Sequence, residues 1–516
     1  MSLKKEEETV SYQKPDKVYA FGAINKIRVG MCQIHLSDTV VTAPDGTKKT
    51  KQNNPVTVYD TAGPYSDPSF EPVFRNGIPR IREFWNGRRK DIIIQEIVPN
   101  KMRREESDFP QQYPVYIAKP GKPITQMYYA KKRIITPEVE YVAIRENQQM
   151  EALGLKSYIT PDFVRKEVAA GRAVIPANIN HPEVEPMIIG NRFMVKVNTN
   201  IMTDNNAENS VHQMINLCEW GSDMLTDLSS HKHAQPMREW LLRNCPVPIG
   251  VSPLYQAFIE ADEKVENLNW EIFRETLIRQ AEQGVDFMFI PAAMRRKHLR
   301  LIDLRLTDLV SYSGNILCKW MKKRKEENFL YTHFDDICEI LQRYDIMLIL
   351  GSGLRPGSIY DSFDHAQQAE MGEMRNLIEK AWDHYVQIIA EGLGHVPLHK
   401  IKSVVKEYMY IGRGAPVFVM GTIPVDIAGQ HDAIASAIGS AQVAWLGASV
   451  IGGNTAEDYM SSIAGKEKIN IIAHKIAAHA ADLAKEHPGA QIRDNALCKA
   501  RKEGRDDDFR RLVIEP

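Results

Sequence analysis

The densest group of chemically capable side chains lies at residues 391–399, with the sequence Glu-Gly-Leu-Gly-His-Val-Pro-Leu-His. Glu391 and His395 offer a carboxylate and an imidazole, which suit acid–base catalysis or a divalent metal such as zinc. The glycines between them let a ligand approach the backbone. His399 is four residues after His395, but Pro397 argues against the helical geometry of a two-histidine zinc site. A tight turn with an incidental histidine is the structural alternative.

A second candidate is the glycine-rich run at 351–358, Gly-Ser-Gly-Leu-Arg-Pro-Gly-Ser, which follows an apolar segment. Its backbone N–H groups together with Arg355 suit a phosphate or a carboxylate. Such a run is also common in ordinary turns between a strand and a helix, so the motif alone leaves both interpretations open.

Other polar groups favour structural roles. His474 and His479 are five residues apart, a spacing that does not align them on one helix face, so we expect packing or surface positions. Asp227 could carry chemistry, but a structural role in its loop is an equal alternative. The charged run at 501–511 predicts a solvated helix end or a frayed terminus.

The candidate groups sit within a repeating pattern of short apolar runs and amphipathic segments between residues 190 and 455. Clear helical periodicity marks 270–283 and 329–344. Eight strands alternating with helices over roughly 260 residues match a (β/α)8 barrel of the TIM type. A doubly wound sheet is the alternative, but it lacks a glycine-rich fingerprint after the first strand. The predicted strands are 193–200, 223–228, 247–254, 286–290, 308–312, 346–350, 387–391 and 417–421.

Active sites of such barrels form at the carboxyl ends of the strands, which makes the pattern informative about function. We therefore expect a ring of polar groups there. It contains Asn200, Thr226, Asp227, Tyr255, Pro291, Ser311, Tyr312, Ser313, Ser352, Gly353, Leu354, Arg355, Glu391, His395 and Phe418.

The chain divides into three predicted parts in an α/β fold. Residues 1–160 form an N-terminal α+β domain of short strands and loops, 161–470 form the barrel, and 471–516 form a helical C-terminal tail. Thr160 followed by Pro161 has the residue types of a helix start, an N-cap and a first-turn proline.

Composition excludes several classes of protein. The 516 residues are 43% hydrophobic and 25% charged, with a net charge of −1, so nothing favours nucleic acid or an anionic membrane as partner. No two of the six cysteines have C-x-x-C spacing. Residues 1–8 have no apolar segment typical of a signal peptide, and the apolar run at 443–453 is too short to span a bilayer. These features predict a cytoplasmic protein with reduced thiols.

Long segments closely resemble one family, the phosphomethylpyrimidine synthases of thiamine biosynthesis. The run Val-Tyr-Asp-Thr-Ala-Gly-Pro-Tyr-Ser-Asp-Pro at 58–68 and the run Gly-Leu-Arg-Pro-Gly-Ser at 353–358 are specific examples. The similarity covers nearly the whole chain. Further matching segments are 124–131, 175–183, 327–334 and 475–493.

The resemblance implies a (β/α)8 barrel with an N-terminal domain, assembled as a homodimer. It implies a radical enzyme that rearranges 5-aminoimidazole ribotide into hydroxymethylpyrimidine phosphate. S-adenosylmethionine, a [4Fe–4S] cluster and a metal usually taken as zinc belong to this chemistry. By position, the substrate-binding residues would be Asn200, Tyr255, Ser311, Gly353, Leu354, Arg355 and Glu391, with Glu391 catalytic and His395 the first metal ligand.

Several positions depart from the family pattern. Thr226 replaces a methionine, Pro291 a histidine, Tyr312 an arginine, Ser352 an aspartate and Phe418 a tyrosine. The second metal histidine aligns at or near Tyr459. The family's cluster ligands form a C-x-x-C-x4-C set in a C-terminal extension, and no cysteine set in this sequence has that spacing. The sequence thus predicts a diverged member with a rewritten site.

Three functional hypotheses follow. The first is a cluster-less paralogue that binds a ribonucleotide-like or other phosphorylated ligand through Arg355, Asn200 and Tyr255, as a homodimer or a mixed dimer with a complete paralogue. The second is an enzyme with altered, non-radical chemistry at Glu391 and His395. The third is thiamine pyrimidine synthesis itself, with the cluster segment supplied by a partner or missing from this chain.

Overall fold

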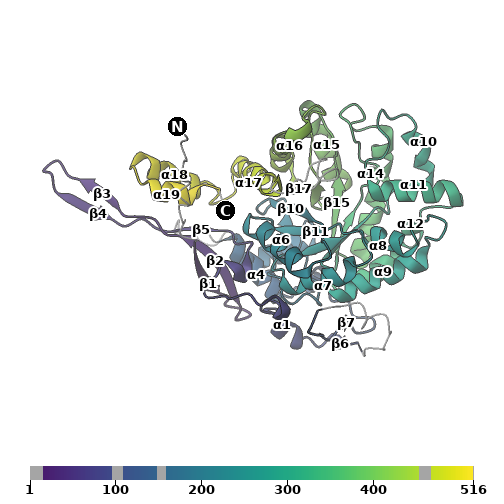
Figure 1. Ribbon diagram of the computed structural model, residues 1–516, viewed down its shortest axis with the longest axis horizontal. Coiled ribbons are helices and arrows are strands. Elements are labelled where there is room, and N and C mark those ends of the chain that lie inside the picture. Colours follow the sequence, from purple (N-terminus) through teal and green to yellow (C-terminus); the bar gives the residue numbers. More distant parts are fainter. Residues whose placement is uncertain (1–14, 96–108, 148–158, 453–465, 515–516) are drawn as a thin grey trace, which may run out of the picture.

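The computed structural model describes residues 15–95, 109–147, 159–452 and 466–514. The predictions made for residues 1–8 and for Tyr459 lie outside these ranges. The centre of the molecule is a closed barrel of eight parallel strands, each hydrogen-bonded to its neighbours in chain order, with the last strand closing on the first (Figure 1). This confirms the predicted (β/α)8 fold. The strands are β10 (Lys196–Ile201), β11 (Met224–Asp227), β12 (Ile249–Val251), β13 (Phe287–Ile290), β14 (Met347–Leu350), β15 (Ile388–Gly392), β16 (Val417–Val419) and β17 (Ala448–Gly452).

Seven of the eight predicted strands overlap observed ones, and the prediction of a strand at 308–312 is wrong. Ser311 is instead the N-cap of helix α11 (Tyr312–Arg324), and its side chain accepts a hydrogen bond from the Gly314 N–H. The barrel strand that the sequence did not predict is β17, which lies inside the apolar run 443–453. Gly447 alone separates it from helix α16 (Asp432–Leu446), so apolar residues on both sides hide the boundary.

The barrel interior is filled by side chains. The ring of Phe287 occupies the space where a side chain at Gly250 would lie. Because this centre is packed, a ligand has to bind at an end of the barrel. The interior cluster comprises Val174, Met187, Ile189, Met224, Phe287, Phe289, Met347, Ile349, Ile389, Phe418 and Val450.

Helices surround the barrel (Figure 1). The predicted helix at 270–283 is confirmed as α9 (Trp270–Gln283), whereas the predicted helix at 329–344 is divided at His333 into α12 (Phe329–Thr332) and α13 (Phe334–Gln342). The remaining helices of this part are α6 (Ala207–Glu219), α7 (Ala234–Asn244), α8 (Pro253–Glu260), α10 (Leu299–Ile302), α14 (His365–Asp383), α15 (Leu398–Ile411) and α17 (Lys466–Ala484), with short 3-10 turns η4 (Arg296–His298) and η5 (Gly429–His431).

The N-terminal part is built from small antiparallel sheets. Strands β1 (Asp16–Phe21), β2 (Arg28–Ile34) and β5 (Val56–Val58) form one sheet, and the hairpin of β3 (Thr39–Thr42) and β4 (Lys48–Lys51) projects away from the body (Figure 1). Thr160 caps α5 (Pro161–Ala169) as predicted. The other elements are β6 (Ile92–Ile94), β7 (Tyr116–Ala118), β8 (Ala173–Val174), β9 (Ile189–Gly190), η1 (Gly63–Ser66), η2 (Phe74–Asn76), α1 (Glu83–Gly87), α3 (Gln126–Lys131) and α4 (Pro137–Glu146).

The C-terminal helices return to the N-terminal sheet. After α17, helices α18 (Ile492–Lys502) and α19 (Asp506–Leu512) lie beside β2 and β5, where Ile34, Val56, Ala500 and Leu512 form one buried cluster (Figure 1). The buried carboxylate of Asp508 accepts hydrogen bonds from the backbone N–H and the hydroxyl of Ser37. Of the two alternatives predicted for 501–511, the solvated helix end is confirmed, since α18 ends at Lys502 with exposed residues, and the frayed terminus is wrong, since α19 is anchored through Asp508.

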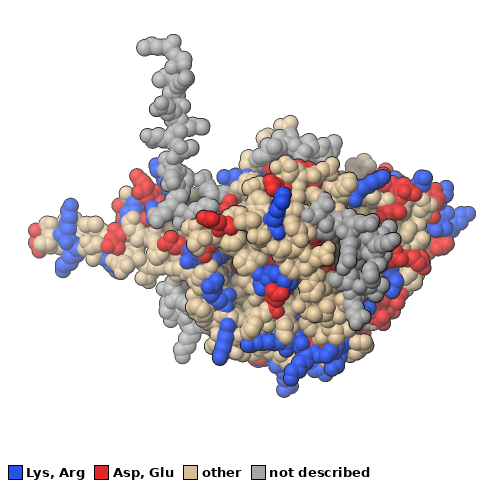
Figure 2. Space-filling view, turned by 60° about the horizontal axis from the view of Figure 1, so that its bottom comes forward, with Lys and Arg blue, Asp and Glu red and all other residues tan. Residues whose placement is uncertain are grey.

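The surface carries both signs of charge. Figure 2 shows basic and acidic side chains on the same face of the molecule, in keeping with the net charge of −1. Within the described ranges, no helix has the length and apolar character needed to cross a membrane.

Candidate functional site

The two glycine-rich segments found in the sequence meet at the carboxyl end of the barrel. The run 351–358 follows β14 and the run 391–395 ends β15, the neighbouring strand. The Glu391 carboxylate accepts a hydrogen bond of 2.6 Å from the Ser352 N–H, and the His395 N–H donates to the Pro356 carbonyl at 3.2 Å. The predicted grouping of these segments in one site is therefore present.

Two buried carboxylates hold the loop after β14. Glu391 binds the N–H of Ser352, while Glu370 of α14 accepts hydrogen bonds from the N–H groups of Gly353 at 2.8 Å and Leu354 at 2.9 Å. The N–H groups of Ser352, Gly353 and Leu354 are thus engaged by carboxylates of the chain itself, which fix the loop. Of the groups that the sequence suggested for a phosphate or a carboxylate, Arg355 remains the candidate for contact with a ligand.

Both carboxyl groups have altered acidity. Burial raises the pKa of Glu391, opposed by the positive charge of Arg355 and the hydrogen bond from Ser352. Burial raises the pKa of Glu370 to about 7, opposed by its hydrogen bonds from Leu354 and Gly353. A buried carboxyl group whose pKa is raised in this way is common at functional sites.

Arg355 is the cation of this site. Its Nη1 lies 3.6 Å from Glu391 Oε1 and donates to the Ser352 carbonyl at 3.2 Å, and its side chain is 13% exposed. Arg305 supports the same loop from the other side, where it donates to the carbonyls of Leu354 and Arg355 and pairs with Asp364. The guanidinium of Arg355 is thus held in place yet reachable by solvent.

His395 is oriented by an acid that the sequence did not indicate. Its Nδ1 lies 2.8 Å from Asp426 Oδ1, and the other Asp426 oxygen accepts a hydrogen bond from the Ile359 N–H at 2.9 Å. Because Nδ1 is engaged, binding of a metal or a proton would fall to Nε2.

Ser311 reaches the site through helix α11. A Cβ atom at Gly314, in the first turn of this helix, would collide with the Gly353 carbonyl oxygen, so the backbones approach closely there. Tyr255 of α8 packs edge-to-face on Tyr312, with ring centroids 4.9 Å apart. Ser311 itself serves as a helix cap and also bonds to the Ser313 hydroxyl at 3.1 Å.

Asn200 is the next-to-last residue of β10 and lies beside Thr226 in the register of the barrel. Since β10 and β14 are four strands apart in a ring of eight, Asn200 lies across the barrel mouth from Arg355. Five predicted site residues thus lie together in the loops after β14 and β15. Ser311 and Tyr255 are connected to these loops through α11, and Asn200 lies on the opposite side of the barrel. The joined residues are Gly353, Leu354, Arg355, Glu391 and His395.

The positions that depart from the family pattern are integrated into packing. Thr226 donates to the Asn198 side-chain oxygen at 2.9 Å inside the barrel, and Phe418 packs edge-to-face on Phe289 at 5.4 Å. The Pro291 carbonyl accepts a hydrogen bond from the Asn328 amide at 3.1 Å. These substitutions therefore have local structural partners.

Sequence reasoning missed Glu370, Asp426 and Arg305. Glu370 had a usable signal, because it lies on the buried face of α14 between Ala366 and Met374, where an acid needs a partner. Asp426 follows β16 closely, but nothing in its neighbours marks it as a partner of His395.

The other predicted structural roles hold, since Asp227 pairs with Arg238 at 2.7 Å and the buried His474 bonds to Ser436.

The cysteines do not fit the cluster that the resemblance implies. All six lie in the described ranges, five of them buried and only Cys498 exposed. They come from separate elements, and in the part of the chain that the structure describes no three His, Cys, Asp or Glu side chains converge to hold a metal ion. A [4Fe–4S] cluster needs several thiolates at one place. His395 with Asp426 likewise makes an incomplete zinc site.

Residues 125–516 match the model of the Radical SAM ThiC family, and residues 11–93 match the ThiC-associated domain. Among solved structures, the dihydropteroate synthase of Stenotrophomonas maltophilia with imidazole in its active site shares 13% identity, covering 58% of this chain and 96% of that one, with a TM-score of 0.35. The Coxiella burnetii dihydropteroate synthase in complex with pteroic acid shares 12% identity, covering 56% of this chain and 94% of that one, with a TM-score of 0.32. We draw no conclusion from these two structures. The family match, in contrast, covers the whole barrel and the tail, and this chain belongs to the Radical SAM ThiC family.

Proposed function

We propose that this family member binds a phosphorylated, ribonucleotide-like ligand at the carboxyl end of the barrel and does not run the cluster-dependent radical step by itself. Family membership supports a connection with thiamine pyrimidine synthesis, whose substrate is such a ribotide. The observation that carries the proposal is the fixed cation Arg355, held beside the buried Glu391 by a loop that two carboxylates clamp.

Each of the predicted site residues has a part in such binding. Arg355 presents planar N–H donors that match a phosphate in geometry and charge. Glu391, 3.6 Å away, accepts hydrogen bonds from hydroxyl or amino groups of the same ligand. Asn200 and Tyr255 approach from other sides of the barrel mouth with an amide and a phenol. Since the cysteines do not fit a cluster, no radical step is assigned to this chain.

The proposed ligand pocket is tested by the binding of 5-aminoimidazole ribotide without iron or S-adenosylmethionine. Calorimetry should show binding to the unmodified protein and at least roughly tenfold weaker binding to Arg355→Met, because one charge-assisted pair is worth about 1.5–3 kcal/mol. Arg413→Met is the matched control, since Arg413 is an exposed arginine paired with Glu379. Absence of ribotide binding, or equal binding by Arg355→Met, would contradict the proposal.

Assembly is a further part of the proposal. The resemblance implies a homodimer, and we extend this to a mixed dimer with a complete paralogue that carries the cluster cysteines. An apolar face supports pairing with another chain of this kind, because α16 and α17 expose Ile434, Ile438, Trp445 and Ile476, each more than half exposed.

A further inference from the structure

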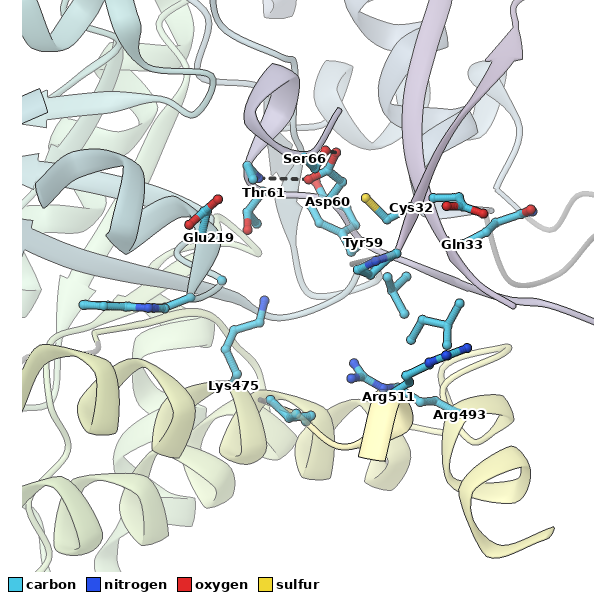
Figure 3. Close-up of a pocket in the computed structure, with 18 of the residues that line it drawn as sticks. Cys32, Gln33, Tyr59, Asp60, Thr61, Ser66, Glu219, Lys475, Arg493 and Arg511 are labelled. Carbon is cyan, nitrogen blue, oxygen red and sulfur yellow. Dashed lines mark hydrogen bonds between the residues drawn. The ribbon is translucent and has the colours of Figure 1, made fainter. Parts of the chain in front are cut away.

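A cavity of about 570 Å³ lies between the N-terminal sheet and the C-terminal helices (Figure 3). One side is formed by β2 and the loop after β5, and the other by α17, α18 and α19. Residues 219–221, which also line it, lead into β11, so the cavity belongs to the amino end of the barrel. It is therefore separate from the site built on Arg355 and Glu391, and its size is typical of small-molecule sites.

One wall of this cavity is cationic. It carries Lys475 of α17, Arg493 of α18, and Arg510 and Arg511 of α19. Figure 3 shows Lys475 extending from its helix into the space below Thr61 and Asp60, with Arg493 and Arg511 on the same side. Four cations from three helices thus face one space.

Lys475 pairs with Asp223 at 3.2 Å, whereas some other cations of this wall have no carboxylate partner among the described residues. Arg493 donates hydrogen bonds to two main-chain carbonyls, those of Leu512 at 2.8 Å and Val513 at 2.6 Å. Within the described ranges, neither Arg493 nor Arg510 forms an ion pair with a carboxylate. Burial lowers the pKa of Arg493, with only Asp494 opposing. Arg493 is half-buried and Arg510 is exposed, so the wall presents positive charge to the cavity and favours an anion.

The acids of the opposite wall are mostly engaged. Asp60 pairs with Lys17 and accepts hydrogen bonds from the Ser66 hydroxyl at 2.8 Å and the Ala62 N–H at 2.9 Å (Figure 3). Asp16 pairs with His35 at 3.3 Å on the surface. Glu219 is the third acid, beside Trp220. The acids are therefore on the sheet and barrel side, while the cations are on the helical side.

Two aromatic side chains and one hydroxyl complete the cavity. Trp220 and Tyr59 line it together with apolar groups such as Ile34. The Tyr59 hydroxyl is buried and has no hydrogen-bond partner among the described residues, although buried hydroxyls are usually paired. Tyr59 also lines an adjoining cavity of about 150 Å³ that shares Lys475 and Arg493. The space thus offers apolar contact, an unused hydroxyl and a cationic wall.

We propose that this cavity binds a small phosphorylated molecule with a flat ring, such as a nucleoside monophosphate. The phosphate contacts Lys475, Arg493 and Arg511, and the ring lies against Trp220 or Tyr59. Since the cations come from the C-terminal helices and the opposite wall from the N-terminal sheet, the bound molecule links these two parts of the chain. The inference does not depend on the function proposed for the carboxyl end of the barrel.

Adenosine 5′-monophosphate is the first probe, with adenosine and inorganic phosphate as its two fragments. Calorimetry on the full chain should show that the monophosphate binds more tightly than either fragment. The double variant Lys475→Met/Arg511→Met should bind at least tenfold more weakly, and Arg511→Lys should retain part of the affinity. Arg413→Met is the control for loss of a distant arginine and should bind like the unmodified protein. The titrations are repeated in the Arg355→Met background, where binding of the monophosphate at the barrel site is weakened and the remaining binding reports on this cavity.

Hydrogen exchange distinguishes loss of binding from loss of folding. The monophosphate should slow exchange in residues 58–66 and 492–512, and the double variant should show native exchange in the barrel strands without this protection. The proposal is overturned if adenosine monophosphate, ribose 5-phosphate and inorganic phosphate all fail to bind. It is also overturned if Arg355→Met abolishes binding while the double variant does not, because the ligand then occupies the barrel site.

Discussion

At the scale of single residues, Glu370 gives the site a dependence on pH. Burial raises the pKa of Glu370 to about 7 in the folded chain, so folding disfavours the ionised carboxylate. The contribution of Glu370 to the stability of the fold is therefore full below the ordinary pKa of a glutamate and is lost as pH rises through 7. Between pH 5 and pH 8 the free energy of unfolding of the native protein should fall by about 2–3 kcal/mol relative to Glu370→Gln. Urea unfolding at both pH values measures this difference.

Glu373 on the same helix is the matched control. Burial opposes its ionisation, but its hydrogen bond from Lys297 and the charge of Arg295 lower its pKa. The contribution of Glu373 to stability is present at high pH and lost as pH falls. Glu373→Gln should therefore change the dependence of the unfolding free energy on pH in the direction opposite to Glu370→Gln. Parallel profiles for the native protein and Glu370→Gln would show that Glu370 does not titrate as described.

At the scale of elements, the pair α18 and α19 depends on one buried carboxylate. Asp508→Ala removes the acceptor for the Ser37 N–H and hydroxyl and the partner of Arg505. We expect a loss of about 2 kcal/mol in the local stability of these helices, which makes exchange of their amides roughly thirtyfold faster. Hydrogen exchange read by mass spectrometry checks this. Asp507→Ala, an exposed neighbour, should change little, and acceleration throughout the barrel would contradict a local anchor.

At the scale of the whole molecule, the positions of the cysteines lead to a prediction about the radical reaction. After anaerobic reconstitution with iron and sulfide, we expect this chain alone to retain no [4Fe–4S] cluster and to make no pyrimidine from aminoimidazole ribotide and S-adenosylmethionine. The reason is that five cysteines are buried in separate elements. Four irons per chain, with product, would restore the family reaction to this protein. The same assay with a complete paralogue tests the mixed dimer.

The sequence by itself determined the barrel, most of its strands and the grouping of Arg355, Glu391 and His395. Strand periodicity and the rule that sites form at the carboxyl ends of barrel strands are local properties of the chain, and they sufficed for this. The sequence could not place strand β17, because a nearly continuous apolar run extends from α16 across Gly447 into the strand.

Only the tertiary structure decided which partners these residues meet. Glu370 accepts hydrogen bonds from the N–H groups that the sequence suggested for a phosphate, and Asp426 binds His395 from another loop. The tail returns to the first sheet through Asp508 and Ser37, 471 residues apart, and so creates the cationic cavity. Such contacts depend on the folded path of the whole chain. They do not produce a pattern in the residues nearby in sequence, whereas helices and strands show a periodicity in consecutive residues.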